Sequence, residues 1–295
     1  MELDRLERLF SSEDPREVEK VYSFDRDTIV KWMKERPSPE FRVKEVEGDE
    51  EVVVVIPTAD LKGDKAREAS SVFSPLHVVL VESKGPLFNY SKSVNLGIMK
   101  AMERSPKWVV VSNDDVHGRD NVSKLLDGLS TSTKGMVMAS PSFYHTYKVS
   151  LIEMKPYFLK GMNLIGKIGR LPPAEVYSYL AMRYGGRLGV KTLTVIDSML
   201  GPMKRIAGEV KDSLVNAGSF MVLNRRVING NVLDETFVNG YEDVYLSMKM
   251  RDDCEVIDFK IDEERGASLG FGKLRFFKSF VNEVYLNSLL WTKTS

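Results

Sequence analysis

The segment "VVVSNDDVHG", residues 109–118, places an asparagine and two aspartates one residue after a run of valines. Such a run predicts a buried strand, and a carboxylate costs solvation free energy as soon as it is partly buried. In open α/β sheets, ligands bind beyond the carboxyl ends of the strands. Asn113, Asp114 and Asp115 are therefore candidates for a site that holds a hard divalent cation, Mg²⁺ or Mn²⁺. The alternative is that they only cap the next helix.

Three other segments resemble this strand and extend the pattern on both sides of it. They read "EVVVVIPT" (residues 51–58), "LHVVLVES" (76–83) and "GMVMASPS" (135–142). Strands that are hydrophobic on both faces, with helical or loop segments between them, are typical of a parallel sheet covered by helices. We therefore expect an α/β fold with a mostly parallel, doubly wound central sheet.

Charge and periodicity divide the rest of the chain. Residues 1–50 carry 15 acidic and 10 basic side chains and predict an N-terminal extension of one or two surface helices. The main domain is expected over residues 51–295. Within it, residues 144–211 form a basic insertion with 11 basic and four acidic side chains, a net charge of +7. The insertion separates residues 51–143 from residues 212–295, which end in a periodic, helix-like stretch.

Composition limits the possible partners and locations. The 42 basic and 42 acidic side chains balance, so nothing indicates a nucleic-acid-binding protein. A single cysteine, Cys254, excludes an internal disulfide and fits a reducing compartment. No apolar run approaches the roughly 20 residues of a spanning helix. We expect a cytoplasmic protein, with the basic insertion either a solvated lobe or a peripheral contact with anionic lipid at the inner membrane face.

A second acidic group lies in "FVNGYEDVYLSMKMR", residues 237–251. Glu242 and Asp243 open a predicted helix, where the helix dipole stabilises negative charge, so we expect both to stay ionised. A fixed carboxylate near a metal-bound diphosphate can take a proton from an attacking hydroxyl group. The alternative is that the pair only complements the helix dipole.

With these residues in hand, the sequence resembles the family-2 glycosyltransferases of the GT-A fold. The motifs that carry the resemblance, in order along the chain, are "VVVVIPTAD", "VVLVES", "SVNLGIMKA", "SNDDV", "AGSFMVLNRRVI" and "GYED". They cover about residues 51–140 and 215–270. The resemblance implies a nucleotide-binding half over residues 51–143 and an acceptor half over residues 212–295.

The resemblance also implies roles for single residues. Pro57, Thr58 and Glu82 would line the nucleotide pocket, and Asn95, Asn113 and Asp114 would help to bind the donor. Asp115 would hold the metal. Asp243 would be the catalytic base, with Glu242 as its supporting neighbour. The implied reaction moves a sugar, with inversion, from a nucleoside-diphosphate donor to a hydroxyl of a glycan or a lipid-linked acceptor, with Mn²⁺ or Mg²⁺.

The chain departs from the family pattern in one important place. Relatives often carry a histidine some 20 residues after the acidic pair, whereas this chain offers Glu263 and Glu264 there. Two alternatives stay open: either glutamate ligates a hard cation in its place, or the contact is absent and donor binding is weaker. Two other functions stay open: a sugar-nucleotide nucleotidyltransferase, and a non-catalytic protein that binds sugar nucleotides.

Overall fold

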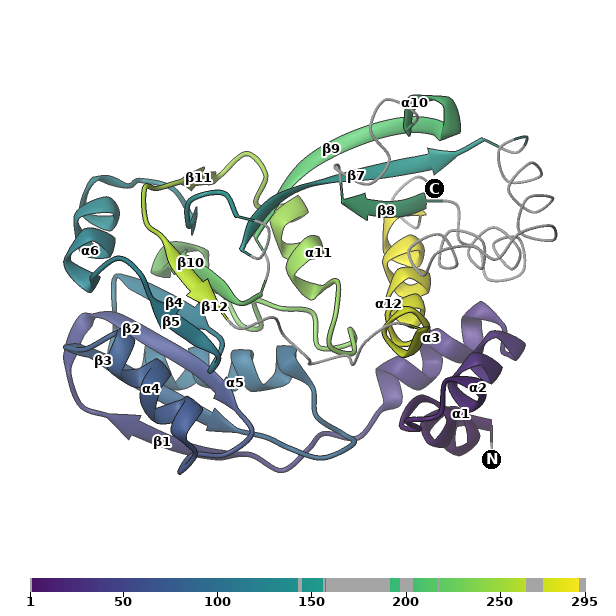
Figure 1. Ribbon diagram of the computed structural model, residues 1–295, viewed down its shortest axis with the longest axis horizontal. Helices are drawn as coiled ribbons and strands as arrows, with labels where there is room; N and C mark the ends of the chain where they lie inside the picture. Colours follow the sequence, from purple (N-terminus) through teal and green to yellow (C-terminus); the bar gives the residue numbers. More distant parts are fainter. Residues whose placement is uncertain are drawn as a thin grey trace.

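A seven-stranded sheet with helices on both faces is the largest sheet among the described residues and lies on the left in Figure 1. The structure, a computed structural model, describes residues 2–142, 145–155, 157, 192–196, 204–216, 218–263 and 273–291. The strand order is β1-β3-β2-β4-β10-β6-β11. The strands are β1 (Arg42–Val46), β2 (Asp49–Thr58), β3 (Leu76–Glu82), β4 (Trp108–Ser112), β6 (Met136–Met138), β10 (Phe220–Asn224) and β11 (Cys254–Val256).

Most strands of this sheet run in one direction. Strand β2 is parallel to β3 and β4, and β6 is parallel to β11. Strand β10 is antiparallel to both of its neighbours, β4 and β6, and β1 is antiparallel to β3. The expected α/β fold with a mostly parallel sheet is confirmed. The carboxyl ends of β2, β3 and β4 therefore meet at one edge of the sheet.

Valines on alternate faces of β2 hold the layers together. Val52 and Val54 belong to a core shared with α4 (Asp64–Val72) and α6 (Val122–Thr131). Val53 and Val55 face the opposite side, toward α5 (Tyr90–Met102) and α11 (Glu242–Lys249). All four side chains are at most 2% exposed. Burial on both faces explains why the sequence shows an uninterrupted apolar run rather than alternation.

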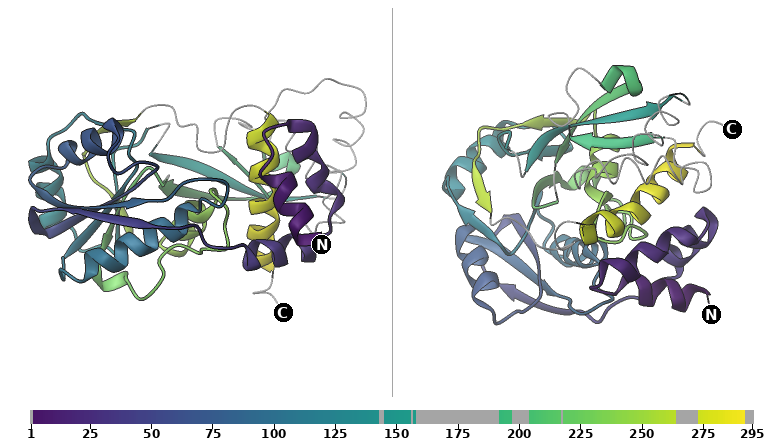
Figure 2. Two further views of the ribbon diagram at one scale, coloured as in Figure 1. Left: turned by 90° about the horizontal axis from the view of Figure 1, so that it is seen from below. Right: turned by 45° about the vertical axis from the view of Figure 1, so that its right-hand side comes forward.

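The N-terminal helices pack against the C-terminal helix (Figure 2). These elements are α1 (Glu2–Phe10), α2 (Pro15–Val18), the 3₁₀ turn η1 (Glu19–Ser23), α3 (Arg26–Glu35) and α12 (Lys273–Trp291). Leu6 and Ile29 are fully buried in one cluster with Val281 and Val284 of α12. The expected surface helices thus contribute to a shared core.

Arg36 links these helices to one another and to the central domain. The Arg36 Nε lies 2.9 Å from the Glu7 Oε2, and the Arg36 side chain is 3% exposed. The same guanidinium donates to the carbonyl oxygen of Pro86, in the loop before α5. Its carbon also lies 5.7 Å from the centre of the Phe10 ring, in cation–π contact. Residue 36 therefore fastens the N-terminal helices to the loop from which α5 begins.

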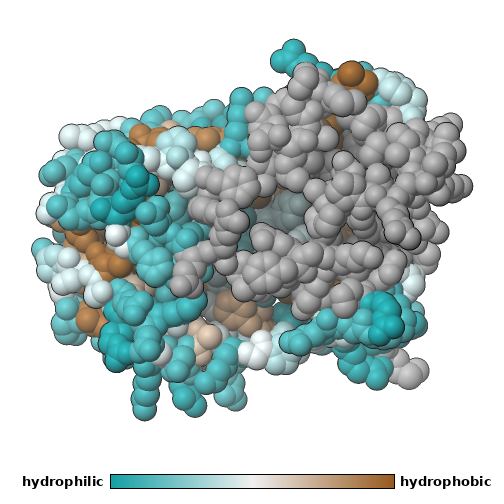
Figure 3. Space-filling model, in the orientation of Figure 1, coloured by the Kyte–Doolittle hydropathy of each residue, from teal (hydrophilic) through white to brown (hydrophobic). Residues whose placement is uncertain are grey.

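The edge strand β1 also comes from the first 50 residues. All but one of its residues are exposed, and Arg42, Lys44 and Glu45 lie on it. Hydrophilic residues predominate over this part of the surface, at the lower left of Figure 3. Charged side chains on an edge strand oppose pairing with another chain. The predicted N-terminal extension thus contributes both helices and a strand.

The described part of the basic insertion is mostly β-structure. Strands β8 (Thr192–Ile196), β7 (Thr146–Met154) and β9 (Gly208–Asn216) form an antiparallel sheet, and α10 (Lys204–Ala207) precedes β9. Much of the insertion lies outside the described residues. The remaining elements are β5 (Val116–Gly118), which pairs with β12 (Ile261–Glu263), and the turn η3 (Arg225–Val227). Across the described ranges, no helix has the length and apolarity that crossing a membrane requires.

A buried asparagine on α5 anchors the loop that leads to α11. The Asn95 Oδ1 accepts hydrogen bonds from the amides of Val232 at 3.1 Å and Leu233 at 3.0 Å. Its Nδ2 donates to the Leu233 carbonyl at 2.8 Å and to the Glu235 Oε1 at 3.0 Å. These four bonds use both donors and both acceptor positions of the amide. The side chain is therefore committed to the loop.

Further asparagines fix the same loop along its length. Asn89 caps α5 through the amide of Lys92 at 2.9 Å and donates to the carbonyl of Phe237 at 3.0 Å. The Asn239 Oδ1 accepts from the amide of Tyr90 at 2.8 Å. Asn239 has a φ of 56°, a left-handed conformation that asparagine tolerates well. The start of α5 and the chain entering α11 are thus held side by side.

We expect the Asn95→Ala substitution to destabilise the protein. Truncation leaves buried backbone groups of the loop unpaired, so the free energy of unfolding should fall by roughly 2 to 4 kcal/mol. Urea denaturation measures this. The control is Met99→Ala on the same helix, whose side chain is 59% exposed and which should change stability by less than about 0.5 kcal/mol. Equal effects of the two substitutions would contradict the anchoring role.

Candidate functional site

The polar residues after β4 lie at the edge where the parallel strands end. The Thr58 hydroxyl at the end of β2 donates to the Asp114 Oδ2 at 2.6 Å. The amide of Asn113 donates to the carbonyl of Ser219, just before β10, at 2.9 Å. The segment after β4 that was predicted from the sequence therefore bonds to the end of β2 and to the residue before the start of β10. Asp115, partly buried, directly precedes β5.

Four carboxylates gather near the hydroxyl of Tyr90, at the start of α5. Burial raises the pKa of this phenol well above its ordinary value, and the charges on Glu242, Asp243, Glu263 and Asp115 raise it further. The Tyr90 hydroxyl donates to the carbonyl of Gly218. The charges of residues from β12, α11 and the segment after β4 thus act on one tyrosine.

Gly218 positions Asp243 relative to Tyr90. Its amide donates to the Asp243 Oδ2 at 3.0 Å, while its carbonyl accepts from Tyr90. The amide of Val244 donates to the other oxygen, Oδ1, at 2.7 Å. A β-carbon at residue 218 would lie 3.1 Å from the Tyr90 Cε1, which is tighter than nine in ten such contacts, so the ring would have to shift. Glycine therefore lets the backbone approach the ring and hold the carboxylate.

The acidic pair at the start of α11 is buried rather than solvated. Glu242 is 5% exposed, and its Oε2 has no hydrogen-bond partner among the described residues. Burial and the charge on Asp243 raise the pKa of Glu242 to about 8. Burial also raises the pKa of Asp243, against the effect of the Gly218 and Val244 hydrogen bonds. The expectation that both carboxylates stay ionised is wrong for Glu242, because desolvation outweighs the helix dipole.

A histidine lies beside Glu263 although it comes from far upstream. The His145 Nδ1 is 3.9 Å from the Glu263 Oε2 and 3.1 Å from the Ser219 hydroxyl. Its Nε2 donates to the carbonyl of Ile261 at 2.6 Å, and burial lowers the pKa of the ring. Burial, with a further contribution from the charge on Asp115, raises the pKa of Glu263 to about 7.

The predicted nucleotide-pocket residues have defined places near this edge. Pro57 is buried at the end of β2, opposite Val81. Glu82, 7% exposed at the end of β3, accepts from the amide of Leu61 at 3.0 Å. The structure gives Asn95 the loop contacts described above, and Glu264 lies outside the described residues. The pocket assignments of Pro57, Thr58 and Glu82 stay predictions.

Sequence reasoning did not single out Tyr90, Gly218 or His145. Tyr90 lies just before the motif "SVNLGIMKA", and Gly218 lies within "AGSFMVLN". Only the folded structure shows that the Tyr90 hydroxyl bonds to the Gly218 carbonyl. His145 stands on the wrong side of the acidic pair in the sequence. It reaches Glu263 because its ring nitrogens bond to the carbonyl of Ile261, on the same strand as Glu263, and to the hydroxyl of Ser219. No spacing rule along the chain encodes these contacts.

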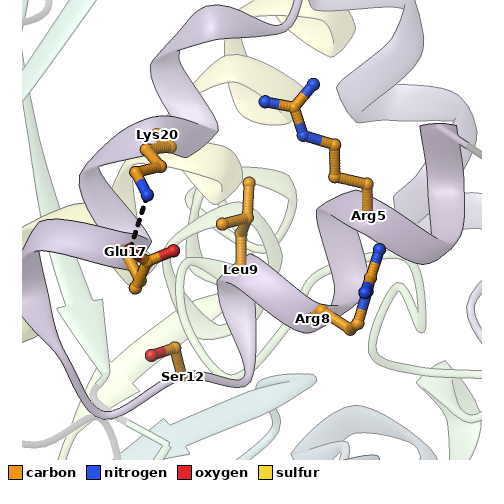
Figure 4. Close-up of a pocket in the computed structure, with 6 residues that line it drawn as sticks. All are labelled: Arg5, Arg8, Leu9, Ser12, Glu17 and Lys20. Atoms are coloured by element: carbon orange, nitrogen blue, oxygen red, sulfur yellow. Dashed lines mark hydrogen bonds and ion pairs between the residues drawn. The ribbon is translucent and has the colours of Figure 1, made fainter.

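A basic hollow lies elsewhere, on the N-terminal helices (Figure 4). It is lined by Arg5, Arg8, Leu9, Ser12, Glu17 and Lys20. The carboxylate of Glu17 accepts from the Lys20 Nζ at 2.5 Å. The other two charged residues of the lining, Arg5 and Arg8, therefore give the hollow its net positive charge. None of the residues predicted from the sequence lines this hollow.

No family model and no curated protein matches the chain. A solved structure described as "Crystal Structure of A197 from STIV" is similar to it over 76% of this chain and 91% of that chain. The two are 9% identical, with a TM-score of 0.41. A likeness of this degree carries no argument, so any conclusion about function depends on the residues themselves.

Stability should depend on pH through Glu242. Its folded pKa of about 8 exceeds the ordinary value of 4.5, so between these values the folded protein holds a proton that the unfolded chain has lost. The free energy of unfolding should therefore fall as pH rises through this window, by about 1.4 kcal/mol per unit of pKa difference. Urea denaturation in EDTA at about pH 5 and pH 8 measures this dependence.

Glu242→Gln should flatten the profile and make the variant more stable than wild type at about pH 8. The matched control is Asp252→Asn, an exposed acid just after α11 whose loss should leave the profile as in wild type. If Glu242→Gln keeps the wild-type slope, Glu242 does not hold its proton in the folded state.

Proposed function

We propose that this protein is a metal-dependent inverting glycosyltransferase of the GT-A fold. The observation that carries the proposal is the gathering of Asp115, Glu242, Asp243 and Glu263 around Tyr90. They lie at the carboxyl-end edge of a mostly parallel sheet, where ligands of open α/β folds bind. The motifs that resemble family-2 glycosyltransferases contribute three of the four acids.

The chemistry of Asp115 and Glu263 fits a hard divalent cation. Both offer carboxylate oxygens, and the charge on Asp115 makes ionisation of Glu263 less favourable. A bound Mn²⁺ or Mg²⁺ would reverse this effect and keep both groups ionised. The cation would supply stabilisation of the negative charge on the departing nucleoside diphosphate. Glu263 is thus the proposed substitute for the histidine that relatives carry.

Asp243 has the properties of a general base. Two backbone amides fix its orientation, and burial raises its pKa, so it binds a proton more strongly than an exposed aspartate. It would accept the proton of the acceptor hydroxyl while that oxygen attacks the anomeric carbon from the side opposite the diphosphate. The sugar is then transferred with inversion.

Glu242 is a second candidate for the same role. Its pKa of about 8 is nearer to neutrality, and its Oε2 has no hydrogen-bond partner among the described residues. A group protonated at neutral pH is, however, a poor base until a cation or substrate lowers its pKa. We therefore retain Asp243 as the base and Glu242 as its neighbour that modulates it.

Two other functions use the same residues differently. A non-catalytic sugar-nucleotide binder needs the cation site but not a base, so it predicts binding without turnover. A nucleotidyltransferase needs a glycine-rich, basic segment after the first strand, where this chain has "PTADLKGDKAR". The proposed acceptor is a hydroxyl group of a glycan or of a lipid-linked acceptor at the membrane surface. No nucleic acid is expected as partner.

Asp243→Asn should abolish most of the transfer activity. The amide keeps the size of the carboxylate but cannot accept a proton, so transfer should fall by about 10²- to 10⁴-fold. Turnover of common sugar nucleotides with Mn²⁺ measures this effect, and calorimetry should find donor affinity almost unchanged. Glu242→Gln is the matched comparison and should reduce transfer less.

Transfer at the wild-type rate in Asp243→Asn would reject this residue as the base. A larger loss in Glu242→Gln would exchange the roles of the two. Donor binding with no turnover in the wild-type protein, across nucleosides and acceptors, would favour the non-catalytic binder.

Asp115→Asn and Glu263→Gln should each weaken binding of a nucleoside diphosphate in Mn²⁺. The loss should disappear in EDTA, because both residues act through the cation. Calorimetric titration with and without Mn²⁺ measures the difference. Asp120→Asn, a change in an acid that binds Lys124 outside the cluster at 2.9 Å, is the control. Equal losses with and without the metal would contradict the ligand role.

A further inference from the structure

A second group of acids lies at the opposite edge of the sheet, where the parallel strands begin. Glu47 belongs to the turn between β1 and β2, Glu50 lies near the start of β2, and His77 lies near the start of β3. One potential ligand atom from each residue lies within 4.8 Å of the others. This group shares no residue with the carboxylates around Tyr90.

The histidine of this group is completely buried and points toward acids on both sides. His77 is 0% exposed. Its Nε2 lies 2.9 Å from the Glu45 Oε2, a hydrogen bond. Its Nδ1 has no hydrogen-bond partner among the described residues, and the Glu47 Oε2 lies 3.6 Å away, beyond hydrogen-bonding distance. An unpartnered ring nitrogen therefore faces the carboxylate of an exposed glutamate.

This arrangement is typical of a metal-binding histidine. Such a histidine donates one ring N–H to a carboxylate, which orients the ring and leaves the other nitrogen free to bind the metal. Here Glu45 is the carboxylate acceptor and Nδ1 is the free nitrogen. Bonds of about 2.0–2.1 Å in a tetrahedral site place neighbouring ligand atoms roughly 3.3 Å apart. The Nδ1 and Glu47 oxygen are already close to this separation.

The charges around His77 leave room for a cation. Arg104 is the positive group: its nitrogens lie 2.8 Å from Glu50, 3.0 Å from Glu45 and 3.7 Å from Glu47. One guanidinium therefore faces three carboxylates. A divalent cation would balance the remaining two negative charges when His77 is neutral. The side chains of Glu47 and Glu50 are 77% and 44% exposed, so both can move by the small distance that ligation requires.

We infer that Glu47, Glu50 and the His77 Nδ1 bind a divalent transition-metal ion, Zn²⁺ or a metal of similar preference. An imidazole with two carboxylates suits Zn²⁺, whereas Mg²⁺ seldom takes a nitrogen ligand. The ion fastens the β1–β2 turn to the start of β3. Its position, at the far edge from the carboxylates around Tyr90, gives it a structural role.

The alternative is an ion-pair network without metal. In that case His77 carries both ring protons and donates toward Glu45 and Glu47, and Arg104 neutralises the rest. This network predicts that Zn²⁺ leaves stability unchanged. The metal site predicts that Zn²⁺ raises the unfolding temperature, because a ligand that binds only the folded state stabilises it.

The test uses the full chain carrying Asp115→Asn, which removes the proposed catalytic metal ligand. Zn²⁺ is titrated by calorimetry after EDTA treatment, and thermal unfolding is followed with and without Zn²⁺. Loss of a partner that only orients a metal ligand typically weakens metal binding by 10- to 100-fold. Glu47→Gln and Glu50→Gln remove a ligand itself, so each should weaken Zn²⁺ binding by at least this much. Glu45→Gln should weaken it within that range, because it only orients the ring.

The matched control is Glu51→Gln, an exposed glutamate directly after Glu50 and outside the group. It should bind Zn²⁺ as the parent does. Each glutamate variant is first checked for an unchanged circular dichroism spectrum, since all of them keep the size of the side chain. If Zn²⁺ binds equally well to the Glu47, Glu50 and Glu51 variants, or does not raise the unfolding temperature of the parent, the inference is wrong. This result would leave the proposed transferase activity untouched.

Discussion

The close approach of α5 to β2 determines where the acids at the carboxyl-end edge lie. A β-carbon at Gly97 would lie 2.2 Å from the Val55 Cγ1, so only glycine permits this distance. With the helix so placed, Asn95 reaches the backbone of Val232 and Leu233, and Tyr90 reaches Gly218. The loop held in this way leads directly into α11. Two residues of an Asn-x-Gly motif therefore set the approach of one helix and the start of another.

Much of the fold could be predicted because burial leaves a direct record in the sequence. Valine runs predicted β2, β3 and β4, and the helix predicted at "GYED" begins at Glu242, within the motif, as expected. The antiparallel direction of β10 leaves no such record, because its burial resembles that of a parallel strand. For the site, Asp115 and Asp243 were found by their positions at element ends. The approach of His145 to Glu263 depends on contacts of its ring with Ser219 and Ile261, which are distant in the sequence.

The ionisation of the acidic pair shows a different limit of sequence reasoning. A helix N-terminus favours negative charge by a fraction of a kcal/mol to about 2 kcal/mol, and this effect is visible in sequence. Desolvation of a carboxylate is a larger effect and depends on packing from distant segments. For Glu242 the second effect prevails.

The two edges of the sheet also differ: Arg104 is the counter-ion beside Glu50, whereas backbone amides hold Asp243.

The packing of the first helices on the last one has a consequence for biosynthesis. Leu6 and Ile29 share their core with Val281 and Val284, which lie far downstream in the chain. While the chain is being synthesised, the N-terminal helices have an apolar face and no partner for it. Contacts between such distant residues slow folding, and exposed apolar surface in a partly folded chain promotes aggregation. Completion of this core therefore has to wait for the synthesis of α12, whatever the central sheet has already formed.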